Sequence, residues 1–349
     1  MMRRRDVLTT VGAATATALA GCSDRTPDVE RVAVGATPAF SAAANDQDVA
    51  STWLVEEFRA RTETQVDWNT PPGGLSAYVT RRLQGRPLGA DVFLGVTPVS
   101  LAAARTHTTD LFAVLEDDLA DRASGDAGFD PLKRVAPVTQ SAVAVIYDST
   151  TLSAPETFDE LLTAEHAPDL ALADPRTDDI GGLFYLWSIY RFGLAEARRR
   201  WAAVLDSGVN LYPSTSAAFA AYREGAIPML VAPATTTLFA GRHQLPLEEY
   251  RVRFPDGAAY RHVTGVGRFA DGLNPENASD FASFLYEPEV QGRLAVLTGT
   301  RPVTDDANLP EDFDEYVHDP DSTIAYDYTT LATNLETWMD AWRALVTAE

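Results

Sequence analysis

Short apolar runs alternate with longer stretches of helical periodicity between residues 31 and 303, and this alternation constrains the fold more than any other feature. Ala90 to Val96 (ADVFLGV) is almost continuously apolar, which is typical of a parallel strand buried on both faces. Further strands are predicted at 31–36, 65–68, 138–147, 170–173, 228–232 and 263–269, and helices at 49–61, 75–83, 181–205, 216–223, 277–286 and 289–298. Strands that alternate with helices in this way predict an α/β fold with mostly parallel sheets.

The first 22 residues have the pattern of an export signal. Arg3 and Arg4 belong to a basic start, and the run from Val7 to Ala20 is apolar but too short and too polar to span a bilayer. The paired arginines indicate the twin-arginine export route. The single cysteine, Cys22, ends a Leu-Ala-Gly-Cys sequence that resembles a lipobox. We therefore predict a signal over 1–22, a lipid anchor on Cys22, a polar tether over 23–30 and a location on the outer face of the cell membrane.

The charge balance is strongly acidic. The chain has 28 Lys and Arg against 50 Asp and Glu, a net charge of −22, and Lys133 is its only lysine. In roughly molar salt the Debye length is about 3 Å, so repulsion between these carboxylates is screened while their hydration keeps the protein soluble. We therefore expect a haloarchaeal source and a solvated surface for acidic stretches such as Asp305 to Asp321. A nucleic-acid partner is not expected, because its phosphates would be repelled.

Several kinds of chemistry have no motif in this sequence. One cysteine provides neither a disulfide framework nor a thiolate metal cluster. The five histidines form no H-E-x-x-H pair, no G-x-S-x-G elbow occurs, and the only lysine follows Leu132 rather than the glycine of a phosphate-binding loop. We therefore expect no enzyme activity, no metal site and no cofactor. The 349 residues are enough for two packed domains.

Five segments, taken in order, resemble thiamine-binding proteins of ABC importers. The most specific is Ala173-Asp174-Pro175-Arg176-Thr177 followed by Gly181-Gly182-Leu183, which resembles their "DPRT…GLG" segment. The others are Ala90 to Gly95 (their "ADVVLG" strand), Ser141 to Asp148 (their strand into the second lobe), Leu297 to Val303 with Leu309-Pro310 (their late turn), and a closing helix with Trp338 and Trp342. The resemblance covers nearly the whole mature chain, which is thereby identified as a member of the wider solute-binding family.

This resemblance implies a two-lobe periplasmic binding protein fold of type II, with mostly parallel sheets and hinge strands between the lobes. The first lobe would hold residues 31–139 and part of 262–320, the second 140–261, and a C-terminal helix within 321–349 would pack on both. A solute would bind between the lobes at the carboxyl ends of the strands, and hinge closure would bury it. The implied partners are a permease with its ATPase and, through the anchor, the membrane. We expect a monomer.

The resemblance also indicates where the solute would bind. Thiamine-binding relatives hold the ligand between aromatic rings, but this chain has small polar residues at the matching positions. A ring would have to come from elsewhere, from Phe40, Tyr185, Tyr212 or Tyr260. The expected ligand-binding residues are Thr37, Phe40, Thr97, Gln140, Asp178, Asp179, Gly181, Thr215, Ser216, Thr235, Tyr260 and Arg301.

Asp178 and Asp179 stand where relatives place Ser, Thr and Gly, at the start of a predicted helix. Either they cap the helix, or they oppose an anion and favour a cation. We expect a cationic or neutral organic solute, with thiamine or a thiamine-like cation as the best single candidate. Two alternatives stay open. One is a ferric-iron receptor, although those relatives ligate iron with adjacent tyrosines that this chain lacks. The other is a secreted enzyme on the same scaffold.

Overall fold

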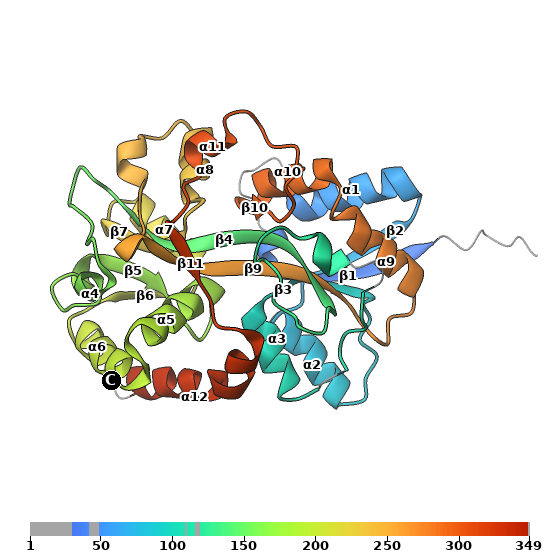
Figure 1. Cartoon of the computed structure of the whole chain (residues 1–349), viewed down its shortest axis with the longest axis horizontal. Coiled ribbons are helices and arrows are strands. Elements are labelled where there is room, and N and C mark those ends of the chain that lie inside the picture. The colour runs from blue at the N-terminus through green and yellow to red at the C-terminus, as the bar shows by residue number, and fades with distance from the viewer. Residues whose placement is uncertain (1–29, 42–48, 109, 116–118, 348–349) are drawn as a thin grey trace, which may run out of the picture.

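The structure, a computed structural model, describes residues 30–41, 49–108, 110–115 and 119–347. The predicted signal, the lipidation site Cys22 and all of the predicted tether except Glu30 lie outside the described residues. Within them the chain forms two α/β lobes joined by two long strands (Figure 1).

Strands and helices alternate through most of the chain, as predicted. The strands are β1 (Arg31–Ala36), β2 (Gln65–Asn69), β3 (Val92–Val96), β4 (Val135–Tyr147), β5 (Leu170–Ala173), β6 (Asn210–Tyr212), β7 (Met229–Pro233), β8 (Arg251–Arg253), β9 (Ala258–Arg268), β10 (Arg301–Pro302) and β11 (Ser322–Ile324). The α-helices are α1 (Ala50–Thr62), α2 (Leu75–Leu83), α3 (Pro98–Arg105), α4 (Phe158–Leu161), α5 (Asp179–Phe192), α6 (Leu194–Asp206), α7 (Thr215–Arg223), α8 (Thr236–Arg242), α9 (Pro275–Phe284), α10 (Pro288–Thr298), α11 (Phe313–Tyr316) and α12 (Tyr328–Val346).

The strands form one sheet in the order β2-β1-β3-β9-β4-β7-β5-β6. At one end β1 pairs in parallel with β2 and β3, and at the other end β5 pairs in parallel with β6 and β7. The long strands β4 and β9 run antiparallel to each other between these ends. Residues 135–143 of β4 pair with β9, residues 139–140 also pair with β10, and residues 143–147 pair with β7. The chain therefore passes from one lobe to the other along these two strands, as the family resemblance implies.

Helices cover both faces of the sheet, which explains why β3 and β5 are buried at every position. One core lies under α2, α3, α5, α6 and α12 and extends through both lobes. The opposite face has separate cores, one under α1, α9 and α10 and another under α7 and α8. The carboxyl ends of β3 and β5 consequently lead into helices on the same, continuous side of the molecule.

The prediction of one helix over 181–205 is wrong. The structure has two helices, α5 and α6, separated at Gly193. Gly193 has φ of 72° and ψ of 159°, a conformation that side-chain-bearing residues avoid. The helical periodicity continues across the break because both helices face the same core, and this is why the pattern looked unbroken.

The last helix, α12, packs against α3 of the first lobe and α6 of the second, and spans one side of the molecule (Figure 1). Its Trp342 is fully buried, and the indole Nε1 donates a hydrogen bond of 3.1 Å to Asp174 Oδ1. None of the helices in the described ranges combines the length and the apolar character needed to cross a membrane.

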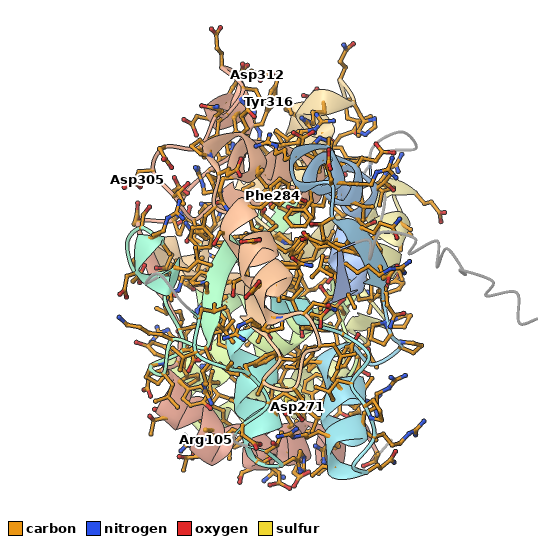
Figure 2. The ribbon with its side chains drawn as sticks, turned by 90° about the vertical axis from the view of Figure 1, so that its right-hand side faces the viewer. Arg105, Asp271, Phe284, Asp305, Asp312 and Tyr316 are labelled. Carbon is orange, nitrogen blue, oxygen red and sulfur yellow. The ribbon has the colours of Figure 1, made fainter. Side chains whose placement is uncertain are left out.

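The acidic stretch before β11 lies at the surface. Asp305 and Asp312 are exposed and lie at the outer edge of the molecule in Figure 2, whereas the nearby Phe313 is buried. Tyr316, at the end of α11, packs over Gly241 of α8. This stretch therefore has the solvated carboxylates that its sequence predicts, and its apolar residues attach it to the second lobe.

Candidate functional site

A cavity of about 610 Å³ lies between the two lobes, on the side of the sheet that α12 covers. The beginning of α3 borders it from the first lobe, and the beginning of α5 borders it from the second. Residues 260–263 of β9 pass along it, and residues 325–339 close it. This volume is typical of a small-molecule site.

The walls of this cavity are mainly apolar and include several aromatic side chains: Phe129, Tyr260, Tyr326 and Tyr328. The Tyr260 hydroxyl accepts a hydrogen bond of 3.1 Å from the backbone N–H of Tyr326, which fixes the two tyrosines relative to each other. The Tyr326 ring in turn packs on Trp338 of α12, with 4.6 Å between ring centres. Burial raises the pKa of Tyr326 to about 12, so this hydroxyl stays neutral at ordinary pH. Rigid, neutral aromatic walls of this kind suit a flat organic ligand or a cation.

Asp178 caps α5 and also joins two elements of the second lobe. Its carboxylate accepts hydrogen bonds from the backbone N–H groups of Ile180 (2.9 Å) and Gly181 (3.3 Å). It accepts two more from Thr215 at the start of α7, from the backbone N–H (2.8 Å) and the hydroxyl (2.7 Å). The charge of Asp178 is therefore taken up by the protein itself, which confirms the capping interpretation for this residue.

Asp179 has a different environment from its neighbour. Its side chain faces the cavity, and no described group donates a hydrogen bond to its carboxylate. Asp179 is an exposed residue, but protein is packed around its carboxyl group, and this surrounding protein raises its pKa. Asp178 therefore has the predicted capping role, whereas the carboxyl group of Asp179 borders the cavity without a hydrogen-bond donor among the described residues.

His262 faces the same cavity from β9. Its Nδ1 lies 3.4 Å from the Ser141 hydroxyl of β4, and its Nε2 is buried without a hydrogen-bond partner among the described residues. Burial lowers the pKa of this imidazole, and the negative charge of Asp179 acts in the opposite direction. A buried polar atom with no hydrogen-bond partner lowers the stability of the protein, so a polar group of a ligand that bonded to Nε2 would remove this cost.

Several other polar groups around the cavity are engaged within the protein. Thr97 caps α3, accepting a hydrogen bond of 3.1 Å from the backbone N–H of Ser100. Asp130 forms a buried ion pair with Arg134 at 2.9 Å. Arg261 pairs with Asp126 at 2.5 Å, and Asp327 caps α12. The groups left for a ligand thus include Asp179, His262 and the buried Tyr328 hydroxyl, which has no hydrogen-bond partner among the described residues.

A second, smaller hollow of about 210 Å³ lies between α7, α8 and the end of α10. It contains three of the predicted residues, Thr215, Ser216 and Thr235. The Thr215 hydroxyl is bonded to Asp178, and the Thr235 hydroxyl donates to the carbonyl oxygen of Gly299. Thr235 lies in the turn that precedes α8, and its hydroxyl connects this turn of the second lobe to the end of α10. Ser216 is exposed at this hollow.

The predicted site residues therefore fall into three groups. Thr97, Asp178, Asp179 and Tyr260 border the large cavity, and Thr215, Ser216 and Thr235 border the hollow. Thr37, Phe40, Gln140, Gly181 and Arg301 border neither.

The residues of this last group have contacts inside the protein. Phe40 is 2% exposed in the core of the first lobe, so its ring packs there instead of facing a ligand. Gln140 donates to the carbonyl oxygen of Pro302 at 2.9 Å. Arg301 pairs with Asp319 at 2.8 Å. Thr37 follows β1 and packs beside Gly95.

Two important residues of the cavity, His262 and Tyr326, were not predicted. His262 alternates with apolar residues in a strand-like run, and nothing in that pattern tells which face of the strand borders a cavity. Tyr326 belongs to no strongly periodic segment. Its cluster of aromatic residues with Tyr328 and Trp338, near the end of the chain, was the one available signal.

Comparison with known proteins gives consistent results. Residues 53–320 match a family described as bacterial extracellular solute-binding protein. The thiamine-binding periplasmic protein of Brucella abortus biovar 1 (strain 9-941) is 24% identical over 295 residues, which are 83% of this chain and 85% of that protein. The solved structure of a periplasmic thiamin binding protein superposes with a TM-score of 0.79 at 22% identity, over 91% of this chain and 96% of the other. The apo ferric ion-binding protein A of Pasteurella haemolytica superposes with a TM-score of 0.74 at 13% identity, over 91% and 98%.

Proposed function

Because the chain belongs to the family of bacterial extracellular solute-binding proteins, we propose that it is the receptor of an ABC importer for a small organic cation. Thiamine or a thiamine-like cation is the best single candidate. The receptor would hold the solute between its lobes and deliver it to a permease with its ATPase. The type II binding-protein fold, shared with the solved thiamin-binding and ferric-binding structures, supplies the two lobes and the crossing strands.

The observation that carries this proposal is the chemistry of the large cavity. It joins neutral aromatic walls to a carboxyl group, Asp179, that no described residue neutralises by a hydrogen bond. A flat heterocyclic cation satisfies both features, through stacking on the tyrosines and through its charge. A phosphate ester would instead bring negative charge next to Asp179. This chemistry therefore favours unphosphorylated thiamine over its phosphates.

The arrangement of donors gives less support to the two alternatives. In the described part of the chain, no group of three or more His, Cys, Asp or Glu side chains is placed to hold a metal ion. The ferric-iron alternative thus has the shared fold in its favour but no identified ligand set. For an enzyme, the cavity offers Asp179 and His262, but the hydroxyl within hydrogen-bond distance of His262, that of Ser141, is buried and does not border the cavity.

The proposal includes attachment to the outer face of the cell membrane through Cys22, after twin-arginine export. A receptor that must meet a permease gains from a short tether, because the tether raises its local concentration at the membrane. Mass spectrometry of the protein isolated from its own cells tests this part. We expect a mature chain that begins with a lipid-modified Cys22. A soluble chain with an unmodified Cys22 would contradict the anchor.

Calorimetric titration of the full chain in concentrated salt tests the solute assignment. We expect binding of one thiamine per chain, and weaker binding of thiamine monophosphate. Concentrated salt is used because the acidic surface predicts a halophilic protein. If neither thiamine nor any related cation produced heat, the thiamine assignment would be wrong, and ferric iron would be the next solute to titrate.

A further inference from the structure

Asp179 and His262 face the same cavity from different elements, α5 and β9, and are close enough for their charges to interact. Asp179 accepts no hydrogen bond from a described donor, and the Nε2 atom of His262 has no partner within the described residues. Asp179 is not needed as the cap of α5, because Asp178 already has that role. Both side chains can therefore form polar contacts with a ligand.

Most of the other ionisable groups around the pair already have partners within the protein. From α5, the Asp178 carboxylate accepts four hydrogen bonds. From β9, Arg261 is paired with Asp126, and burial raises the pKa of Tyr260. The remaining neighbours are Asp130, which is paired with Arg134, and Tyr326, Asp327 and Tyr328 of the segment that leads into α12. Asp327 is an exposed helix cap, whose pKa is held low by its hydrogen bonds with Thr330.

An empty cavity favours a pair that carries no net charge. Protein packed around both groups makes a lone charge on either of them costly, which raises the pKa of Asp179 and lowers that of His262. Whether the carboxyl holds the proton or the imidazole takes it, a pair with one proton is neutral overall. Coupled groups of this kind release that proton as a unit rather than as two independent residues.

A cation that enters the cavity changes this balance. Its positive charge stabilises the Asp179 carboxylate and repels an imidazolium, so both interactions favour the fully deprotonated pair. We propose that capture of an organic cation displaces one proton from the Asp179–His262 pair into solvent, so that solute binding is coupled to proton release. This inference rests on the proposed function. The charge balances, because one positive charge enters the cavity as one proton leaves.

The coupling has a definite sign. Where the empty pair holds its proton, solute and proton compete, and the affinity for the cation rises about tenfold for each unit of pH. Above the pH at which the empty pair loses its proton, the affinity becomes independent of pH. Acidification therefore promotes release of the solute.

Calorimetric titrations of the full chain with thiamine test this coupling. They are run over a range of pH in two buffers that differ in ionisation enthalpy, so that a released proton changes the observed heat. We expect release of about one proton per thiamine below the plateau. In Asp179→Asn, which keeps the size of the side chain, we expect about 30-fold weaker binding and no coupled proton.

Asp340→Asn is the matched control, because it removes the same charge from an exposed position of α12 where Asp340 pairs only with Arg343. It should keep both the affinity and the proton release of the wild type. If wild-type binding gave the same heat in both buffers, or if Asp179→Asn still released a proton, the coupling would be overturned while the receptor function stood. If no cation bound at any pH, the proposed function itself would fail, and this inference with it.

Discussion

Replacing Trp342 by alanine is expected to lower the free energy of unfolding by about 3–5 kcal/mol, the range found when a large aromatic side chain is removed from a core. Trp342 is fully buried, and its ring lies 5.1 Å from that of Trp201 and 5.0 Å from that of Tyr185. Its indole also donates to Asp174, whose carboxylate would be left with one donor fewer. The substitution removes packing and a buried hydrogen bond together.

Trp342 belongs to the helix that closes the large cavity, so loss of stability should be accompanied by loss of thiamine binding. Denaturant unfolding followed by circular dichroism measures the first effect. Thr337→Ala, at an exposed position of the same helix, should change the stability by less than about 0.5 kcal/mol. Equal stabilities for Trp342→Ala and Thr337→Ala would show that α12 is not an integral part of the core.

Gly181→Ala is the second substitution with a large expected effect. A Cβ atom at this position would lie 2.0 Å from the carbonyl oxygen of Ala173, far inside contact distance. The obstacle is the backbone of β5, which no side-chain rotation can move. Helix α5 would have to shift away from the sheet, at a cost of about 3 kcal/mol, the upper end of the range for an overpacked core. The predicted ligand contact of Gly181 is thus explained by close packing of helix on strand.

The neighbouring glycine provides a control with the opposite sign. A Cβ atom on Gly182 would have Pro175 O as its nearest atom, at 3.6 Å, an ordinary contact. Gly182→Ala should therefore stabilise the protein by roughly 0.5–1 kcal/mol through the better helix propensity of alanine. Thermal unfolding of both variants compares them directly. If the two alanines destabilised the protein equally, the close approach of α5 to β5 would be contradicted.

The strongly apolar elements could be predicted from the sequence, because a strand that is buried on both faces is apolar at nearly every position. The strand predicted at 170–173 is β5 without any change of boundary. Helices α3 and α8 were missed, since eight and seven residues provide too few turns for a recognisable periodicity. The break at Gly193 was missed because both helices keep their apolar residues toward one core.

The candidate site was only partly predictable, and Asp178 and Asp179 show why. Their position before a helix was clear from the sequence, but two adjacent carboxylates fit the same cap equally well. The choice depends on Thr215, which is brought beside Asp178 by the packing of α7. His262 and Tyr326 become neighbours of Asp179 only when the C-terminal segment folds back across both lobes. Such contacts between distant parts of the chain leave no local pattern.

We expect the large cavity, rather than the hollow between α7 and α8, to hold the solute. Thiamine titration of two cavity-filling variants tests this claim most directly. Ala103→Phe places a ring in the large cavity, and Ser216→Phe places one in the hollow. Both positions are exposed on helices, so both variants should fold. We predict that Ala103→Phe abolishes thiamine binding while Ser216→Phe retains it, and the reverse result would place the solute in the hollow instead.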